Sequence, residues 1–249
     1  MNKKLSLLLL IIFMLPFECY ALEDIDPLLH KWTRDTSANA SDGEQKLTIS
    51  ATYYSNEYVE ALVNSQAEKN LWTNDEMENY KYSLLKTLNF NECIPFHIKM
   101  YVEGVPMYAQ PFDKYIYMRI GKKKYKPLDY DKRFNFKIQG NRDGMVFFPR
   151  YDPDSGKDVL EGARDVRVIL DGSIGYATAA RGDITWVWDI KQDKPKTDTG
   201  KAATRLEIDR LLKRMEKLNA DRAKIQKELD TVNQEYDKIN ARIDELQSE

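Results

Sequence analysis

The residue types best suited to nucleophilic catalysis are Cys93 and His97, in a chain with only two cysteines and two histidines. A cysteine thiolate becomes an effective nucleophile when a neighbouring imidazole accepts its proton. The two residues lie four positions apart in a run that alternates like a β-strand, so about 13 Å separates them at 3.3 Å per residue. We therefore expect no Cys-His dyad, and we expect His30, near the start of the mature chain, to be solvated.

A second candidate is Ser83-Leu84-Leu85-Lys86, which matches the S-x-x-K pattern of serine penicillin-recognising enzymes. The companion S-D-N and K-T-G elements are absent from the sequence, as are G-x-S-x-G, H-E-x-x-H, P-loop and Rossmann glycine patterns. We therefore interpret Ser83 and Lys86 as two residues on the solvated face of a helix. No catalytic residue and no cofactor are predicted.

Alternating carboxylates make the segment from Asp152 to Asp158 similar to a calcium loop. The EF-hand register fails, because Gly156 and Lys157 occupy the positions that require a ligand and a glycine. Pro153 and Gly156 are typical of a turn. We expect a turn here and no metal site.

Tyrosines next to basic residues form a candidate binding surface on the middle strands, where flat rings and positive charges could bind an anionic envelope glycan or a partner protein. Lys122 to Lys126 follow in a predicted hairpin. The alternative is that these tyrosines only reflect the strand preference of that residue. The surface comprises Lys99, Tyr101, Tyr115, Tyr117 and Arg119.

The elements that must position these residues are mostly strands, because apolar residues alternate with polar ones in six runs. Alternation indicates half-buried antiparallel strands, and such strands bury their apolar faces against a second sheet. The sequence predicts a mainly β fold for residues 22–190, an antiparallel β-sandwich of roughly eight or nine strands. Turn signals are Asn141-Arg142-Asp143-Gly144 and the hairpin pair Asp171-Gly172. The runs begin at Leu47, Ile94, Ile116, Phe134, Val166 and Ile184.

A two-helix insertion interrupts the strands at about residues 55–89. Ser55 can cap the first helix, and Thr73 with Glu76 has the spacing of a capping box. The helices cover one end or face of the sandwich, and an α+β fold is the alternative if they pack broadly over one sheet. Residues 191–200 contain no apolar side chain but include Pro195 and Gly200, which predicts a polar linker.

Residues 201–249 carry six heptads without Pro or Gly, which predicts a C-terminal α-helical coiled coil. Eleven of the twelve a and d positions are apolar. Burying them represents roughly 15 to 30 kcal/mol gross, before the entropy of ordering and association is subtracted. The a positions are Ile208, Met215, Arg222, Leu229, Tyr236 and Ile243, and the d positions are Leu211, Leu218, Ile225, Val232, Ile239 and Leu246.

Charge along this helix favours an antiparallel homodimer. Residues 201–227 hold nine basic and four acidic side chains, net +5, whereas residues 228–249 hold two basic and seven acidic, net −5. An antiparallel pair places each positive half beside a negative one, although salt screens such interactions. A parallel pair would also put Arg222 opposite its own copy. A parallel dimer or trimer, a helical partner protein, or a helix folded back on its own domain are the alternatives.

The first 21 residues have the pattern of a secretory signal peptide, with Lys3 and Lys4, an apolar run from Leu5 to Leu15, and a cleavage site after Ala21. A membrane anchor is the alternative, but the run reaches only about half of the ~20 residues needed to span a bilayer. A lipidated Cys19 is disfavoured by the adjacent Glu18. We expect a periplasmic or secreted protein with no membrane span after cleavage.

Cleavage leaves 36 basic and 39 acidic residues, because Lys3, Lys4 and Glu18 are removed. This near-neutral charge argues against nucleic acid as a partner. Cys93 becomes the single cysteine, so it is either buried or paired between chains. We expect a non-enzymatic binding or scaffold protein of a bacterial envelope. The alternative is an envelope glycan or peptide hydrolase with unidentified carboxylate catalysts.

Overall fold

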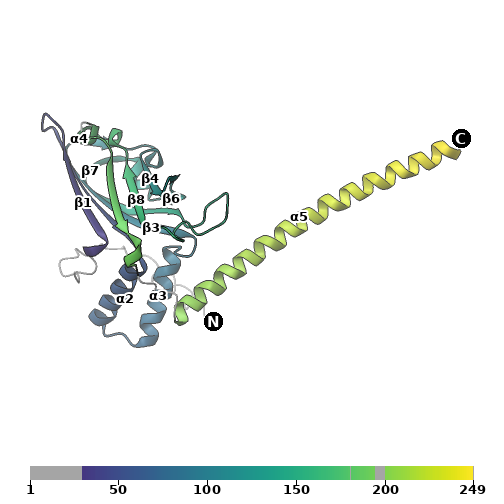
Figure 1. The fold of residues 1–249 in the computed structure, drawn as a ribbon, viewed down its shortest axis with the longest axis horizontal. Coiled ribbons are helices and arrows are strands. Elements are labelled where there is room, and N and C mark those ends of the chain that lie inside the picture. Colours follow the sequence, from purple (N-terminus) through teal and green to yellow (C-terminus); the bar gives the residue numbers. More distant parts are fainter. Residues whose placement is uncertain (1–29, 180, 194–199, 249) are drawn as a thin grey trace, which may run out of the picture.

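A computed structural model describes residues 30–179, 181–193 and 200–248. The predicted signal peptide and most of the predicted linker lie outside these residues. In the described part, a β-rich body carries two helices at one end, and a single long helix leaves the body beside them (Figure 1).

Nine strands form two antiparallel sheets in the described part of the chain, which confirms a mainly β fold. Sheet A has the order β1-β2-β3-β7-β6, and sheet B has the order β5-β4-β8-β9. The strands of sheet A are β1 Thr33–Asn39, β2 Gln45–Tyr53, β3 Cys93–Tyr108, β7 Lys137–Pro149 and β6 Asp129–Tyr130. Those of sheet B are β5 Lys123–Tyr125, β4 Ile116–Ile120, β8 Asp165–Leu170 and β9 Ile184–Asp189.

The alternating apolar residues of both sheets contribute to one hydrophobic core. Ile98 on β3 and Met118 on β4 are both fully buried, as the period-two pattern predicts. Aromatic rings connect the sheets directly, since the Phe96 and Trp188 centroids lie 5.1 Å apart. At the β9 edge, the Trp186 indole Nε1 donates to Thr36 Oγ1 on β1 at 3.0 Å. Core residues of the two sheets are therefore in direct contact.

The predicted two-helix insertion is confirmed as α2 Asn56–Asn70 and α3 Asn74–Thr87. Both predicted caps are present: Ser55 accepts from the Tyr58 amide, and Thr73 and Glu76 form a reciprocal capping box. The helices enclose a second apolar cluster, which consists of Val59, Val63, Leu85, Leu88, Phe90 and Leu206. Because Leu206 belongs to the C-terminal helix, this cluster also fixes the base of that helix.

Two predicted turns are wrong. Residues 141–144 lie inside β7, where Gly144 pairs with Ile98 of β3. The irregularity lies just before them, at Gly140, whose φ of 70° accompanies a register shift in the β3–β7 ladder. Asp171-Gly172 is not a two-residue hairpin, because Asp171 caps the short helix η3 Gly172–Ile174 and α4 Tyr176–Ala179 follows before β9.

A short 3-10 helix replaces the predicted strand in one other place. Phe134 was expected on a strand, but it lies on η2 Lys132–Asn135 and is fully buried there. A further short helix, η1 Phe112–Lys114, precedes β4. Phe134 stacks on Phe112 with 4.6 Å between ring centroids, so the two helices seal one side of the core.

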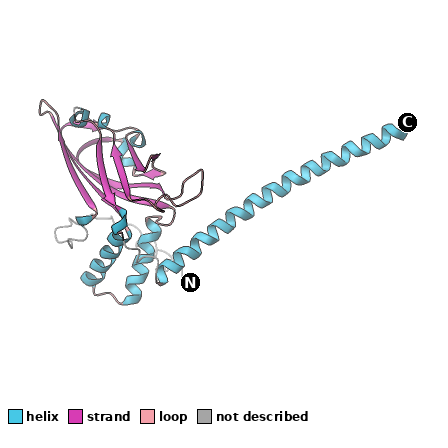
Figure 2. Cartoon of the chain, viewed as in Figure 1, coloured by secondary structure: helices cyan, strands magenta, loops and turns pink. Residues whose placement is uncertain are grey.

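The beginning of the predicted linker belongs to the body. Residues Ile190–Gln192 form η4, and the Asp193 carboxylate accepts from the Asn56 and Glu57 amides at 3.1 and 2.9 Å. A carboxylate there satisfies free amides at the start of α2 and complements the helix dipole. Burial raises the pKa of Asp193. Beyond Gly200, α5 Lys201–Ser248 is one unbroken helix (Figure 2).

Candidate functional site

Among the described residues, helix α5 contacts the body only through its first turns. The Tyr82 hydroxyl donates to Asp209 Oδ2 at 2.6 Å, and the Ala202 amide donates to Glu78 Oε2 at 2.9 Å. The Arg205 guanidinium lies 4.1 Å from the centre of the Tyr82 ring. Leu206 completes the apolar contact with 8% of its surface exposed. These contacts hold the base of α5 against α3.

The attached face of α5 is not the face that carries the heptad pattern. Ala202, Leu206 and Asp209 occupy b and f positions, whereas the apolar seam occupies a and d positions. At 3.6 residues per turn, the two faces lie about 150° apart around the helix axis. The body therefore contacts α5 on the face that carries the b and f positions. The a/d seam, on the opposite face, is not covered by the described residues of the body.

The uncovered seam is a continuous row of large apolar side chains. From residue 211 to residue 247 every α5 side chain is exposed, over a length of about 55 Å at 1.5 Å per residue. Arg222 is exposed as well, and Leu212 at an e position widens the row at its base with 48% exposure. The apolar seam residues have exposures of 50% (Ile208), 51% (Leu211), 53% (Met215), 59% (Leu218), 63% (Ile225), 49% (Leu229), 61% (Val232), 65% (Tyr236), 54% (Ile239), 45% (Ile243) and 54% (Leu246).

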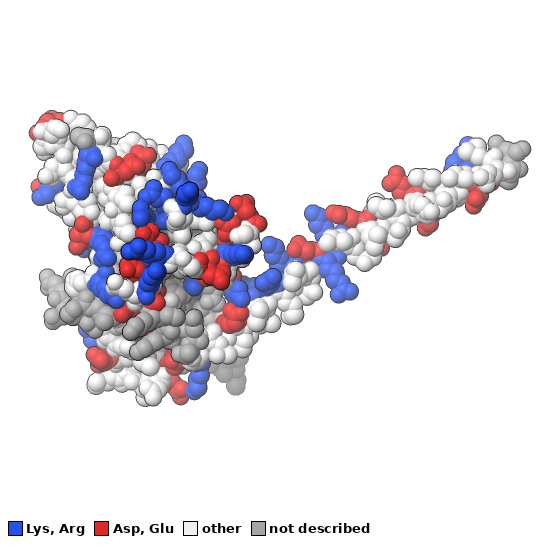
Figure 3. All heavy atoms as spheres, in the orientation of Figure 1, with Lys and Arg blue, Asp and Glu red and all other residues white. Residues whose placement is uncertain are grey.

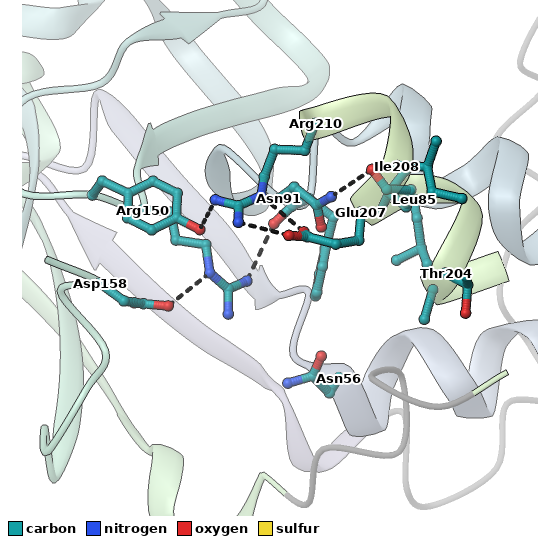
Figure 4. A pocket seen from close by; sticks show the side chains of 13 residues that line it. Asn56, Leu85, Asn91, Arg150, Asp158, Thr204, Glu207, Ile208 and Arg210 are labelled. Atoms are coloured by element: carbon teal, nitrogen blue, oxygen red, sulfur yellow. Dashed lines mark hydrogen bonds and ion pairs between the residues drawn. The ribbon is translucent and has the colours of Figure 1, made fainter. Parts of the chain in front are cut away.

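A cavity of about 480 Å³ lies where α5 meets the body (Figure 4). Its charged side chains are already paired: Arg150 Nε donates to Asp158 Oδ2 at 3.0 Å, and Arg210 forms two 2.8 Å bonds to Glu207. Arg210 also donates to the Tyr151 hydroxyl at 3.3 Å. These contacts connect α5 to the segment after β7, so the cavity is part of the contact region between the helix and the body.

Four of the five residues of the predicted binding surface lie on two different sheets, and Tyr115 lies just before β4. Lys99 and Tyr101 are on β3 of sheet A, in the same ladder as the contact between His97 Nε2 and Asp143 Oδ2 at 3.1 Å. Tyr117 and Arg119 are on β4 of sheet B, and Tyr115 immediately follows η1. Strand register brings Lys124 and Arg167 beside Arg119. Arg167 was missed because only the pairing of β4 with β8 places it there.

The residues that could act as a nucleophile or base are not assembled into a site. Cys93 is 4% exposed, and burial raises the pKa of its thiol. Asn89 Nδ2 lies 3.4 Å from its sulfur, whereas His97 contacts Asp143. Lys86 Nζ contacts the Tyr82 hydroxyl at 3.3 Å on the α5 side of α3. The burial of Cys93 does not suit a disulfide between chains.

Asp152 serves the turn that the sequence predicts. Its carboxylate accepts from Lys123 Nζ at 2.7 Å, the Tyr125 hydroxyl at 3.0 Å and the Ser155 amide at 3.0 Å. The Lys123 ammonium, followed by the Ser155 amide, holds the pKa of Asp152 far below its usual range. Among the residues that the structure describes, no three His, Cys, Asp or Glu side chains gather as metal ligands.

Comparisons with known proteins leave the family open. No family model and no curated protein matches this sequence. A crystal structure of a novel protein of unknown function from Burkholderia pseudomallei K96243 is similar at 8% identity and a TM-score of 0.34, over 72% of this chain and 84% of that one. Within the described residues, no helix combines the length and apolar character needed to cross a membrane.

Proposed function

We propose that this chain is an exported, non-enzymatic binding and scaffold protein of a bacterial cell envelope, which associates through α5 as a coiled coil. The observation that carries the proposal is the exposed a/d seam on the side of α5 opposite its attachment. Apolar patches of this extent on soluble proteins mark interaction sites. A seam with heptad spacing fits a second helix with the same spacing.

In this proposal the β-rich body is a sandwich that carries the ligand-binding part of the protein. The shared core and the contact between Phe96 and Trp188 support a face-to-face arrangement of the two sheets. The predicted signal peptide supports export to the periplasm or beyond, with cleavage after Ala21. The body would then act in the envelope while α5 sets the number of copies.

The proposed partner of the seam is a second copy of the chain in the antiparallel orientation. Each net +5 half would lie beside a net −5 half, and Arg222 would face an apolar d residue rather than another guanidinium. The two bodies would sit at opposite ends of a rod. Such a dimer carries one ligand-binding body at each end.

The first test is the solution mass of the full chain beside a chain that ends at Arg210. The shorter chain keeps Ala202, Leu206 and Asp209, so the contacts between α5 and α3 remain. Sedimentation should show a dimer for the full chain and a monomer for the shorter one. Equal copy numbers in the two chains would overturn the proposed role of α5, and turnover of cell-wall material would overturn the non-enzymatic assignment.

Orientation is tested separately by electron spin distances in a chain with Cys19→Ser and Cys93→Ala. A nitroxide on Asp244→Cys should give an intermolecular distance of about 50 Å, because each label would lie about 17 residues from the seam midpoint. A label on Lys227→Cys, near the midpoint, is the matched control and should give a short distance. Short distances at both sites would show a parallel dimer and would overturn only the antiparallel orientation.

A further inference from the structure

The outer face of sheet B carries a row of cations that spans three neighbouring strands. Register pairs Arg119 of β4 with Lys124 of β5 on one side and with Arg167 of β8 on the other. Neighbouring strands lie about 4.8 Å apart, so the backbone positions of these three residues follow one another at about that spacing. Figure 3 shows Lys and Arg side chains gathering over this part of the body.

Contacts within the described residues leave Arg119 of this row unexplained. Like charges directly opposite each other destabilise a sheet. Lysines commonly protect an edge strand such as β5 from unwanted pairing, but Arg119 and Arg167 lie on the interior strands β4 and β8. Arg119 forms no side-chain hydrogen bond or ion pair with any described residue. Arg167 is held by Asp165, through bonds of 3.1 and 3.0 Å.

Tyr117 lies beside the row on the same face of β4. The Lys124 ammonium lies 4.4 Å from the centre of the Tyr117 ring, so the ring and the charge form one surface. A guanidinium without a partner binds carboxylate or phosphate oxygens in a bidentate manner. Arg119 is therefore the free donor of this surface, flanked by an oriented Arg167 and by Lys124.

From this geometry we infer that the row of Lys124, Arg119 and Arg167, with Tyr117, binds an acidic oligosaccharide that lies across strands β5, β4 and β8. A glycan with repeated carboxylates can present one anion to each strand and a polar, flat ring to the tyrosine. The inference deepens the proposed function, because it rests on the body being the binding part and names its ligand class.

Other anionic partners fit this surface less well. An acidic protein partner would need a desolvated apolar centre, whereas along the register Lys124–Arg119–Arg167–Val187 only Val187 is apolar, at 42% exposure. An anionic membrane is typically bound by a cluster of four to eight basic residues. Lys122, Lys123 and Lys126 of the hairpin bring the basic residues here to six, but Lys123 is paired with Asp152, Arg167 is paired with Asp165, and Asp189 adds a further carboxylate beside the row.

The test is titration of the full chain with oligogalacturonate, monitored by calorimetry at low salt. Arg119→Gln and Arg167→Gln should each weaken binding at least tenfold. Lys99→Gln, on sheet A, is the matched control and should leave binding unchanged. Arg119→Gln should also keep or raise the Tm, because it removes a like-charge pair, and this separates loss of a ligand contact from loss of folding.

Three outcomes would overturn the inference. These are no binding of oligogalacturonate, equal loss in the Lys99→Gln control, and binding as tight to a neutral glucan of the same length or to polyglutamate. The sedimentation mass of the same samples reports on α5 independently. Failed titration of a dimer thus refutes the glycan site alone, whereas glycan binding by a monomer refutes the coiled coil alone.

Discussion

The core of the body and helix α5 differ in the solvent exposure of their large apolar side chains. In the body, Leu47, Ile98 and Phe148 are fully buried, whereas Leu218, Ile225 and Tyr236 of α5 keep 59%, 63% and 65% of their surface exposed. Both regions follow a regular apolar pattern. The strands find their partners within the same chain, whereas no other described element covers the heptads of α5, and in the proposed dimer a second copy does so.

This difference predicts two kinds of stability. The core of the body is intramolecular, so its unfolding should not depend on protein concentration. If a second copy pairs with the seam, the paired state is favoured at higher protein concentration by mass action. The melting temperature of α5 should therefore rise with protein concentration. Substitutions that act on one region and spare the other can therefore test the comparison.

Phe96→Ala should produce the largest effect, and it should be confined to the body. Phe96 is fully buried and contacts Tyr53, Phe148 and Trp188. Removing a buried phenylalanine ring leaves a cavity and lowers the free energy of unfolding by about 3 to 5 kcal/mol. Urea unfolding followed by tryptophan fluorescence measures the loss. Equal destabilisation of the α5 transition would contradict two independent regions.

Ile225→Asp should break the seam and spare the body. A carboxylate at a d position would be buried without a partner in both copies, which is expected to weaken the dimer at least a hundredfold, or about 3 kcal/mol. Sedimentation over a concentration series measures the dissociation constant. Ala223→Asp, at a b position, adds the same charge outside the seam and should leave association unchanged. A dimer that survives Ile225→Asp would show that another surface holds the copies together.

Much of the body could be predicted because local patterns decide it. The alternating runs mark strands whose inward residues are buried, and the caps at Ser55 and Thr73 are short-range hydrogen bonds that the residue types specify. The predicted turn at Asn141 failed because turn-forming residues are also tolerated in a strand whose ladder is irregular, here beside Gly140. The pairing of β7 with β3 outweighed the local preference of residues 141–144 for a turn.

The candidate sites divide in the same way. The heptad residues of α5 could be identified from spacing alone, but the spacing does not say which face meets the body. The row on sheet B depends on register: Arg119 and Arg167 are 48 positions apart in the sequence, and only the β4–β8 ladder makes them neighbours. For the same reason the sequence grouped Lys99 and Tyr101 with Tyr117, although they belong to another sheet.

Arg222→Leu should strengthen association of the dimer, whereas Ile225→Asp should weaken it. Arg222 is the one polar residue among the twelve a and d positions, so its replacement completes the apolar row. Replacing a buried charge by a well-packed apolar side chain is often stabilising, here by about tenfold in the dissociation constant. Lys224→Leu, at a c position, is the control and should have no such effect. Weaker association of Arg222→Leu would mean that Arg222 is paired across the interface.

Asp152→Asn should produce the smallest effect, which should depend on pH and should appear in the body alone. The Lys123 ammonium lowers the pKa of Asp152 in the folded protein, so the carboxylate binds its proton less readily there than in the unfolded chain. A group of this kind stabilises the fold above the unfolded pKa of about 3.9, and the contribution is lost as pH falls toward the folded value. The Tm of the wild type should therefore exceed that of Asp152→Asn at pH 7, and the gap should narrow below about pH 4.

The control for this pH effect is Asp154→Asn. Asp154 lies 3.7 Å from the same Lys123 ammonium, but its side chain is 86% exposed, whereas that of Asp152 is 7% exposed. A surface ion pair of that kind contributes little to stability, so Asp154→Asn should follow the wild type at every pH. Since the described contacts of Asp152 all lie within the body, the dissociation constant of the dimer, measured by sedimentation, should not respond to either substitution. A Tm difference between the wild type and Asp152→Asn that stays constant from pH 7 to pH 3 would show that Asp152 acts through the conformation of the turn rather than through its charge.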